Sequence, residues 1–227
     1  MAKTAVQPQL AQSGTWEQTF RDGTRELLRA SAQWPQLEAQ CPGSRRINRY
    51  YTHLFAQWRR RWEGPLLSRA KAQDTEGKFW SASLSYEVTL LTPTLFSLWW
   101  EAAEEVGEGR PRRVRQGDIW AIPQGTPIGP RAFFAPLGRG WKRTVLEAVE
   151  DQIQSRLQTG EFLFKENWSQ ALRLYFSEEG FFLTPEGPML LYPADTIAPT
   201  LEGFPTFSLS SLLPLKAPES GMPQEET

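Results

Sequence analysis

The chain is poor in the residues that most often carry metal, redox and acid–base chemistry. Among 227 residues it has one cysteine, Cys41, and one histidine, His53. A single cysteine excludes an intrachain disulfide and any two-cysteine zinc or redox motif. The lone histidine lies at helical spacing between apolar residues, without a partner for a Ser-His-Asp arrangement. With no phosphate-binding loop or dinucleotide fingerprint either, the sequence predicts no catalytic residue, no cofactor and no metal site.

Long apolar runs and an excess of charge are also missing. No stretch of about 18 apolar residues occurs, and the first fifteen residues lack the apolar segment of a signal peptide. The sequence as it stands therefore predicts a cytoplasmic protein without a transmembrane segment. A net charge of -1 gives no general reason to expect nucleic acid or an anionic membrane as a partner. The oligomeric state is left open.

Aromatic residues, in contrast, are abundant, with 10 tryptophans and 12% aromatic residues in all. Trp99 and Trp100 are adjacent, and in a strand their side chains would point to opposite faces. One of them can then leave the core, unless a second layer of helices covers both. Because exposed tryptophan suits a protein- or sugar-binding surface, we expect one of this pair on a ligand-binding face.

Arginines form the second candidate for that face. Arg110, Arg112, Arg113 and Arg115 lie within six residues, in what the neighbouring glycines and Pro111 indicate is a loop. Guanidinium groups pair well with phosphates and carboxylates, so this loop could hold an acidic partner. The alternative is a solvated connector. The run of three arginines at 59–61 leaves the same two interpretations open.

Three nearby carboxylates could form a site for general acid–base chemistry or a hard metal ion: Glu101, Glu104 and Glu105. They precede Gly107 in a polar stretch. We therefore expect them at the solvated edge of a sheet.

Periodicity predicts two amphipathic helices and a shorter third one. Ser44 is a plausible N-cap for apolar residues at helical spacing as far as Trp62, and Gly64-Pro65 should end or kink that helix. A second apolar stripe runs from Trp141 to Leu157 and stops at Gly160. The shorter helix would begin at Asn167.

Strands are predicted at Leu84–Leu90, Leu95–Trp100 and Asp118–Ile122. Near the end of the chain, Phe181–Leu183 and Met189–Tyr192 flank a Thr-Pro-Glu-Gly turn, which favours a hairpin that completes the same sheet. The fold class is therefore α+β: an antiparallel sheet with two or three helices packed on one face and a C-terminal β-hairpin.

The domain prediction is a single folded unit over residues 16–215, with a division into lobes 16–75 and 76–215 left open. Residues 1–15 and 216–227 are polar and turn-rich, and we expect them to form disordered tails.

An ordered series of short motifs resembles the RsiV-like domain family of bacteria. After the hairpin come Tyr192-Pro193, Ile197-Ala198-Pro199 and Gly203-Phe204-Pro205, and upstream lies Tyr86-Glu87-Val88-Thr89. The segment Ala32–Leu37 is similar to a motif that precedes these in the family. The resemblance spans about Glu26 to Leu213, and it alone favours a strand over a helix at Arg25–Trp34.

The family is known mainly as a domain of unknown function, found in a lysozyme-sensing anti-sigma factor and beside cell-wall deacetylase domains. The resemblance implies a non-catalytic binding or interaction module for a lysozyme-like protein or a cell-wall glycan, and an extracytoplasmic location if the true start lies upstream. The chain departs from the family in the Val106–Arg115 loop. Two alternatives remain: a cytoplasmic regulatory or structural partner that uses the Arg110–Arg115 loop, and an unrecognised hydrolase.

Overall fold

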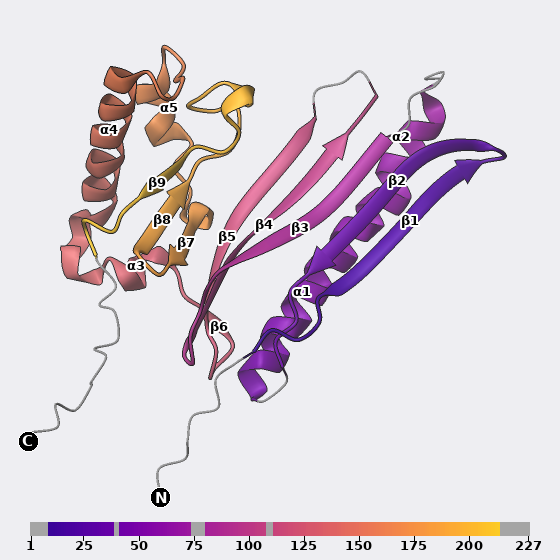
Figure 1. Cartoon of the computed structure of the whole chain (residues 1–227), viewed down its shortest axis with the longest axis horizontal. Coiled ribbons are helices and arrows are strands. Elements are labelled where there is room, and N and C mark those ends of the chain that lie inside the picture. The colour runs from indigo at the N-terminus through magenta and orange to yellow at the C-terminus, as the bar shows by residue number, and fades with distance from the viewer. Residues whose placement is uncertain (1–8, 39–40, 74–79, 108–110, 214–227) are drawn as a thin grey trace, which may run out of the picture.

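The structure, a computed structural model, describes residues 9–38, 41–73, 80–107 and 111–213. It contains a six-stranded sheet covered on one face by a long helix, and a three-stranded sheet that carries the later helices (Figure 1). The α+β class predicted from the sequence is confirmed.

The large sheet is formed by the first two thirds of the chain. Its strands lie side by side in sequence order: β1 (Gly14–Asp22), β2 (Arg25–Trp34), β3 (Trp80–Leu91), β4 (Leu95–Glu105), β5 (Arg112–Ala121) and β6 (Thr126–Pro127). All neighbours are antiparallel except β2 and β3, which are parallel. The strands β2 and β3 can be parallel because the helical segment between them carries the chain back to the end of the sheet where β2 begins. The sheet is therefore mostly, not wholly, antiparallel.

The first helix, α1 (Pro42–Arg61), begins one turn earlier than predicted. Its N-cap is Cys41, whose Sγ accepts a hydrogen bond from the Ser44 backbone N–H at 3.3 Å. Pro42 occupies the first turn, where its missing N–H costs nothing. Cys41 thus has a structural role at the helix start.

Gly64 and Pro65 do not end the helical segment. They lie in a π-helical turn, Trp62–Leu66, that leads directly into α2 (Leu67–Ala72). Proline cannot donate the usual helical hydrogen bond, and a wider turn accommodates the missing donor.

One hydrophobic core lies between α1 and the large sheet. It includes Ile47, Tyr51 and Phe55 from the helix, and Phe96 and Leu98 from β4. Residues that alternate along β4 therefore face α1, as the period of a strand requires.

The remaining chain builds a second core around the small sheet. Its helices are α3 (Pro130–Phe133), α4 (Trp141–Thr159) and α5 (Trp168–Leu174), and its strands are β7 (Phe181–Thr184), β8 (Gly187–Leu191) and β9 (Thr206–Ser208). The predicted hairpin is present as β7 and β8, but it pairs with β9 and not with the large sheet. The prediction that it completes one sheet is wrong, because α4 and α5 bury their apolar faces on this separate sheet.

The two sheets meet where β7 crosses β4 and β5. The buried Ser97 hydroxyl accepts a hydrogen bond from the Leu183 N–H at 2.8 Å. A Cβ atom at Gly117 would lie 2.3 Å from the Phe181 carbonyl oxygen, so only glycine permits this approach. Strand β5 contributes to both cores, with Ile119 in the second and Trp120 in the first, so no boundary between the cores lies at residue 75.

The folded chain begins before Trp16. Leu10 bridges to Leu37 and β1 starts at Gly14, inside the predicted N-terminal tail. Residues 1–8 and the predicted tail at 216–227 lie outside the described residues. None of the helices in the described parts of the chain is long and apolar enough to cross a membrane.

Candidate functional site

The paired tryptophans point to opposite faces of β4, as predicted. Trp100 is 5% exposed and packs edge-on against Trp58 of α1, with ring centroids 6.4 Å apart. Trp99 is half-buried on the opposite face, beside β5. The sequence predicted one of this pair on a ligand-binding face, and Trp99 is the one that is not buried under α1.

The predicted arginine loop is mostly a strand. Arg112, Arg113 and Arg115 belong to β5, which pairs with β4 as far as Glu104 opposite Arg112. The loop prediction is wrong for these three residues, because glycine and proline near the turn masked the strand pattern that follows. Arg110 lies outside the described residues.

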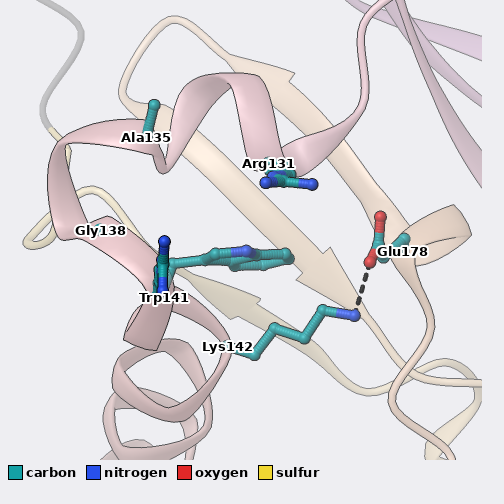
Figure 2. A pocket seen from close by; sticks show the side chains of 7 residues that line it. Arg131, Ala135, Gly138, Trp141, Lys142 and Glu178 are labelled. Carbon is teal, nitrogen blue, oxygen red and sulfur yellow. Dashed lines mark ion pairs between the residues drawn. The ribbon is translucent and has the colours of Figure 1, made fainter.

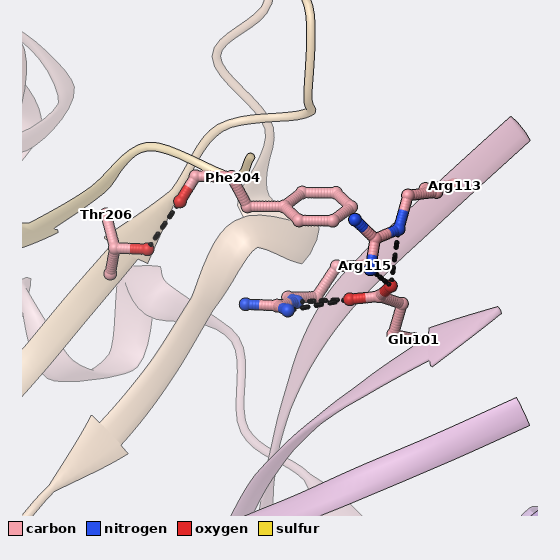
Figure 3. A network of polar contacts seen from close by, with 5 residues as sticks. All are labelled: Glu101, Arg113, Arg115, Phe204 and Thr206. Carbon is pink, nitrogen blue, oxygen red and sulfur yellow. Dashed lines mark hydrogen bonds and ion pairs between the residues drawn. The ribbon is translucent and has the colours of Figure 1, made fainter. Parts of the chain in front are cut away.

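Two of these arginines converge on Glu101 of β4 (Figure 3). Arg113 donates to one carboxylate oxygen at 2.9 Å, and Arg115 donates to the other at 2.6 and 2.9 Å. Glu101 is 6% exposed, not solvated as predicted. A buried carboxylate is stable only when it is paired, and the two arginines provide that pairing. Glu101 lies directly opposite Arg115 in the register of β4 and β5, which brings the two side chains together.

Two aromatic rings flank the Arg115 guanidinium. Its carbon lies 4.0 Å from the Trp99 ring centroid and 4.5 Å from that of Phe204, which is close enough for cation–π attraction on both sides. Phe204 comes from the loop before β9 and reaches the network in Figure 3. Sequence reasoning used Phe204 only as part of the family motif and gave it no role. We call Trp99, Glu101, Arg113, Arg115 and Phe204 the arginine cluster.

A groove of about 290 Å³ borders this cluster. One wall is Arg113–Gln116 of β5, and the other includes Glu179, Gly180, Leu191 and Pro193. Four consecutive residues of one strand can line a groove only where the edge of that strand faces it. We call this feature the β5 groove.

The other arginine run, at 59–61, has structural partners. Arg61 of α1 makes a two-pronged ion pair with Glu104 of β4, at 2.6 and 2.7 Å. Glu104 is 2% exposed, so this pair ties α1 to the sheet from within the core. Arg59 pairs with Glu63 at the surface and lies 5.4 Å from the Trp16 ring centroid.

A polar relay links α1 to β5 inside the first core. The Trp120 indole donates to the Tyr51 hydroxyl at 2.8 Å, and that hydroxyl donates to Asp118 at 3.0 Å. Burial raises the pKa of Asp118 to about 6, although the hydrogen bond from Tyr51 opposes the shift. Burial and the neighbouring Asp118 also raise the pKa of Tyr51.

A second hollow, of about 430 Å³, lies at the start of α4 (Figure 2). Arg131, Arg139 and Lys142 line it together with Trp141, and Lys142 is paired with Glu178 at 2.6 Å. Sequence reasoning did not identify this hollow, because its cations come from separate short elements.

Neither Cys41 nor His53 lines the β5 groove or the hollow at α4. His53 is exposed and is hydrogen-bonded to Gln57 at 3.0 Å. Burial of Cys41 is outweighed by hydrogen bonds from Ser44 and Gly43, which lower the pKa of the thiol. Over the described residues, no group of three or more His, Cys, Asp and Glu side chains could hold a metal ion.

Comparison with known proteins gives similarity at the level of the fold. No family model matches the sequence, and no curated protein matches it significantly. A DUF3298 family protein from Pseudomonas aeruginosa superimposes with a TM-score of 0.57 at 11% identity, over 88% of each chain. A DUF3298 family member from Bacteroides fragilis gives 0.53 at 14% identity, over 88% of this chain and 90% of the other. The chain therefore shares its fold with bacterial proteins whose family is defined as a domain of unknown function.

Proposed function

We propose that this chain is a non-catalytic binding module for a protein ligand, and that the ligand binds at the arginine cluster and the β5 groove. The observation that carries the proposal is the convergence of Trp99, Arg113, Arg115 and Phe204 beside an open groove. Aromatic and arginine side chains dominate the energetic centres of protein interfaces.

The charges at this surface favour an acidic ligand. Arg113 and Arg115 supply two positive charges on this face, of which the buried Glu101 neutralises one, and Arg112 adds a charge on the opposite face of β5. The Arg113 side chain is 48% exposed, so it can reach a carboxylate on a partner. Among the described residues that line the groove, Glu179 on the opposite wall is the one acidic residue.

A protein is favoured over a glycan at this surface. Sugars bind tryptophan by stacking on a ring face, whereas the Arg115 guanidinium already covers one face of Trp99 at 4.0 Å. A lysozyme-like protein is the ligand class that the sequence motifs suggest; it would have to meet this surface with carboxylates, and it would imply an extracytoplasmic location. A cytoplasmic regulatory partner would use the same surface.

An anionic cell-wall glycan is the second candidate ligand, at a different place. The hollow at α4 combines three cations with Trp141, a lining that suits an acidic saccharide.

The test is retention of named ligands on the immobilised full chain. Lysozyme, an extract of a DUF3298-containing bacterium and soluble cell-wall fragments are each applied to the wild type, to Arg113→Gln and to the matched control Arg59→Gln. Both substitutions remove one half-exposed, ion-paired arginine.

We expect Arg113→Gln to weaken retention of a protein roughly fivefold or more and to reduce its salt dependence, while Arg59→Gln binds like the wild type. Equal retention by all three chains would remove the arginine cluster from the site. Retention of wall fragments alone would replace the protein ligand with the glycan.

A further inference from the structure

Within the described parts of the chain, part of the outer edge of β5 is not paired with a strand. β6 covers only its C-terminal end, opposite Trp120 and Ala121. β7 packs against Gly117. Between Gly117 and the start of the strand, the edge borders the β5 groove.

The hydrogen bonds of β6 show which backbone groups point outward. Ile119 and Ala121 use their carbonyl oxygens towards β6, accepting from Ile128 at 2.7 Å and Gly125 at 2.8 Å. Ile122 points the other way, since its N–H donates to Thr94 beside β4 at 2.9 Å. Successive residues of a strand point their N–H and C=O groups towards opposite edges, and β5 pairs with β4 without a bulge that would break this alternation. The N–H and C=O groups of Arg113 and Arg115 therefore point outward, into the groove.

These backbone groups have no partner among the hydrogen bonds of the described residues. An unpaired strand edge is a template for another strand, and most proteins block it with a loop, a bulge or charge. Here the facing wall stands back far enough to leave the groove of about 290 Å³. Arg113 and Arg115 can together offer two donors and two acceptors along that groove.

We propose that an extended acidic segment of a protein partner adds to this edge as a further strand, in line with β6. This mode rests on the function proposed above and specifies it. Main-chain hydrogen bonds to Arg113 and Arg115 would supply affinity, as in other cases of strand addition, and carboxylates on the segment would pair with the exposed arginines.

A second copy of this chain suits the edge less well. In a two-fold pairing of β5 with itself, the arginines of one copy would lie opposite those of the other. Like charges that face each other across strands are destabilising, so the basic edge selects an acidic partner.

The test uses a synthetic peptide as the probe: an acetylated and amidated repeat of four Val-Glu pairs, titrated into the full chain. One comparison peptide replaces glutamate with lysine. Another carries N-methyl groups on every second residue, which removes the donors along one edge and keeps the charge. Binding is followed by amide hydrogen exchange and by affinity.

The protein variants distinguish the contribution of the Arg113 backbone N–H to binding from the contribution of its side chain. Arg113→Ala removes the guanidinium and keeps the outward N–H, whereas Arg113→Pro removes both and leaves the bonds to β4 intact. Folding of both variants is checked by thermal unfolding. If proline unfolds the chain, the N-methylated peptide still tests the same hydrogen bonds.

We expect the acidic peptide to bind and to slow exchange of the Arg113 and Arg115 amides at least tenfold, and the lysine peptide not to bind. N-methylation should weaken binding about tenfold, and Arg113→Pro about fivefold beyond Arg113→Ala, the loss expected for one hydrogen bond. Absence of binding by the acidic peptide, or indifference to N-methylation and to proline, would overturn strand addition. The proposed function would survive that result if a named ligand is still retained through Arg113, and it fails separately if none is.

Discussion

Glu101 and Glu104 lie three residues apart on β4, each paired with arginine, yet they have different surroundings. Glu104 faces α1 and is joined to Arg61 within the first core. Glu101 faces the other way, towards β5 and the loop before β9, where its two arginines border a groove. An acidic residue of β4 therefore ties α1 to the sheet where its side chain faces α1, and it holds the arginines of β5 in place where it faces the other way.

The difference follows from what covers each face. Trp100 packs on Trp58 of α1, which closes that side to solvent. Beside Trp99, the β5 groove stays open, and half of the Arg113 side chain reaches solvent. We therefore expect residues on the α1 face to contribute only to stability, and residues on the groove face to contribute mainly to binding.

The largest effect is expected at the tryptophan pair. Trp100→Ala would leave a large cavity under α1 and lower the free energy of unfolding by about 4 kcal/mol. Trp99→Ala, its neighbour on the open face, should cost about 1 kcal/mol and weaken ligand binding by about 2 kcal/mol. Urea unfolding of both variants measures the stabilities. Equal losses of stability would contradict the assignment of the two faces.

Removing Arg61 should have the next largest effect. Arg61→Ala leaves the buried Glu104 carboxylate without its partner and should cost about 3 kcal/mol of stability. The control Arg59→Ala breaks a surface pair with Glu63 and a cation–π contact with Trp16, and it should cost about 1 kcal/mol. Neither should change ligand affinity, so weaker binding by Arg61→Ala would show that the two faces are coupled.

Asp118 should make the α1 face sensitive to pH. Burial raises its folded pKa from 3.8 to about 6, so between these values the folded state binds more protons than the unfolded state. Its contribution is most favourable below pH 4 and falls by roughly 2 to 3 kcal/mol as the pH rises through 6. Unfolding curves at pH 4 to 7 for the wild type and Asp118→Asn would show this. An identical pH slope in both would refute it.

The smallest effect concerns the Arg115 side chain. Arg115→Lys keeps the charge but loses the planar group between Trp99 and Phe204, and we expect a loss of about 1 kcal/mol in stability. The comparison is Arg113→Lys, which has no ring contact of this kind among the described residues and should cost less. Thermal unfolding distinguishes them, and the reverse order would count against the stacking.

Local patterns in the sequence were enough for several elements. Apolar spacing located α1 and α4, alternation located β3 and β4, and the Thr-Pro-Glu-Gly turn located the β7–β8 hairpin. The strands β1 and β6 were missed, since the nine residues of β1 alternate too little and the two residues of β6 are too few. The strand β5 was predicted to begin at Asp118 but begins at Arg112, because its first half is rich in charged residues.

The sequence by itself determined the α+β class, the opposite orientation of Trp99 and Trp100, and the region in which the arginines gather. These depend on local periodicity, and the two-residue period of a strand holds wherever the strand is placed. Only the tertiary structure decided that the hairpin forms its own sheet, that Glu101 and Glu104 are buried, and that Phe204 reaches Arg115. Those outcomes depend on contacts between residues far apart in the chain, which packing selects and no local pattern specifies.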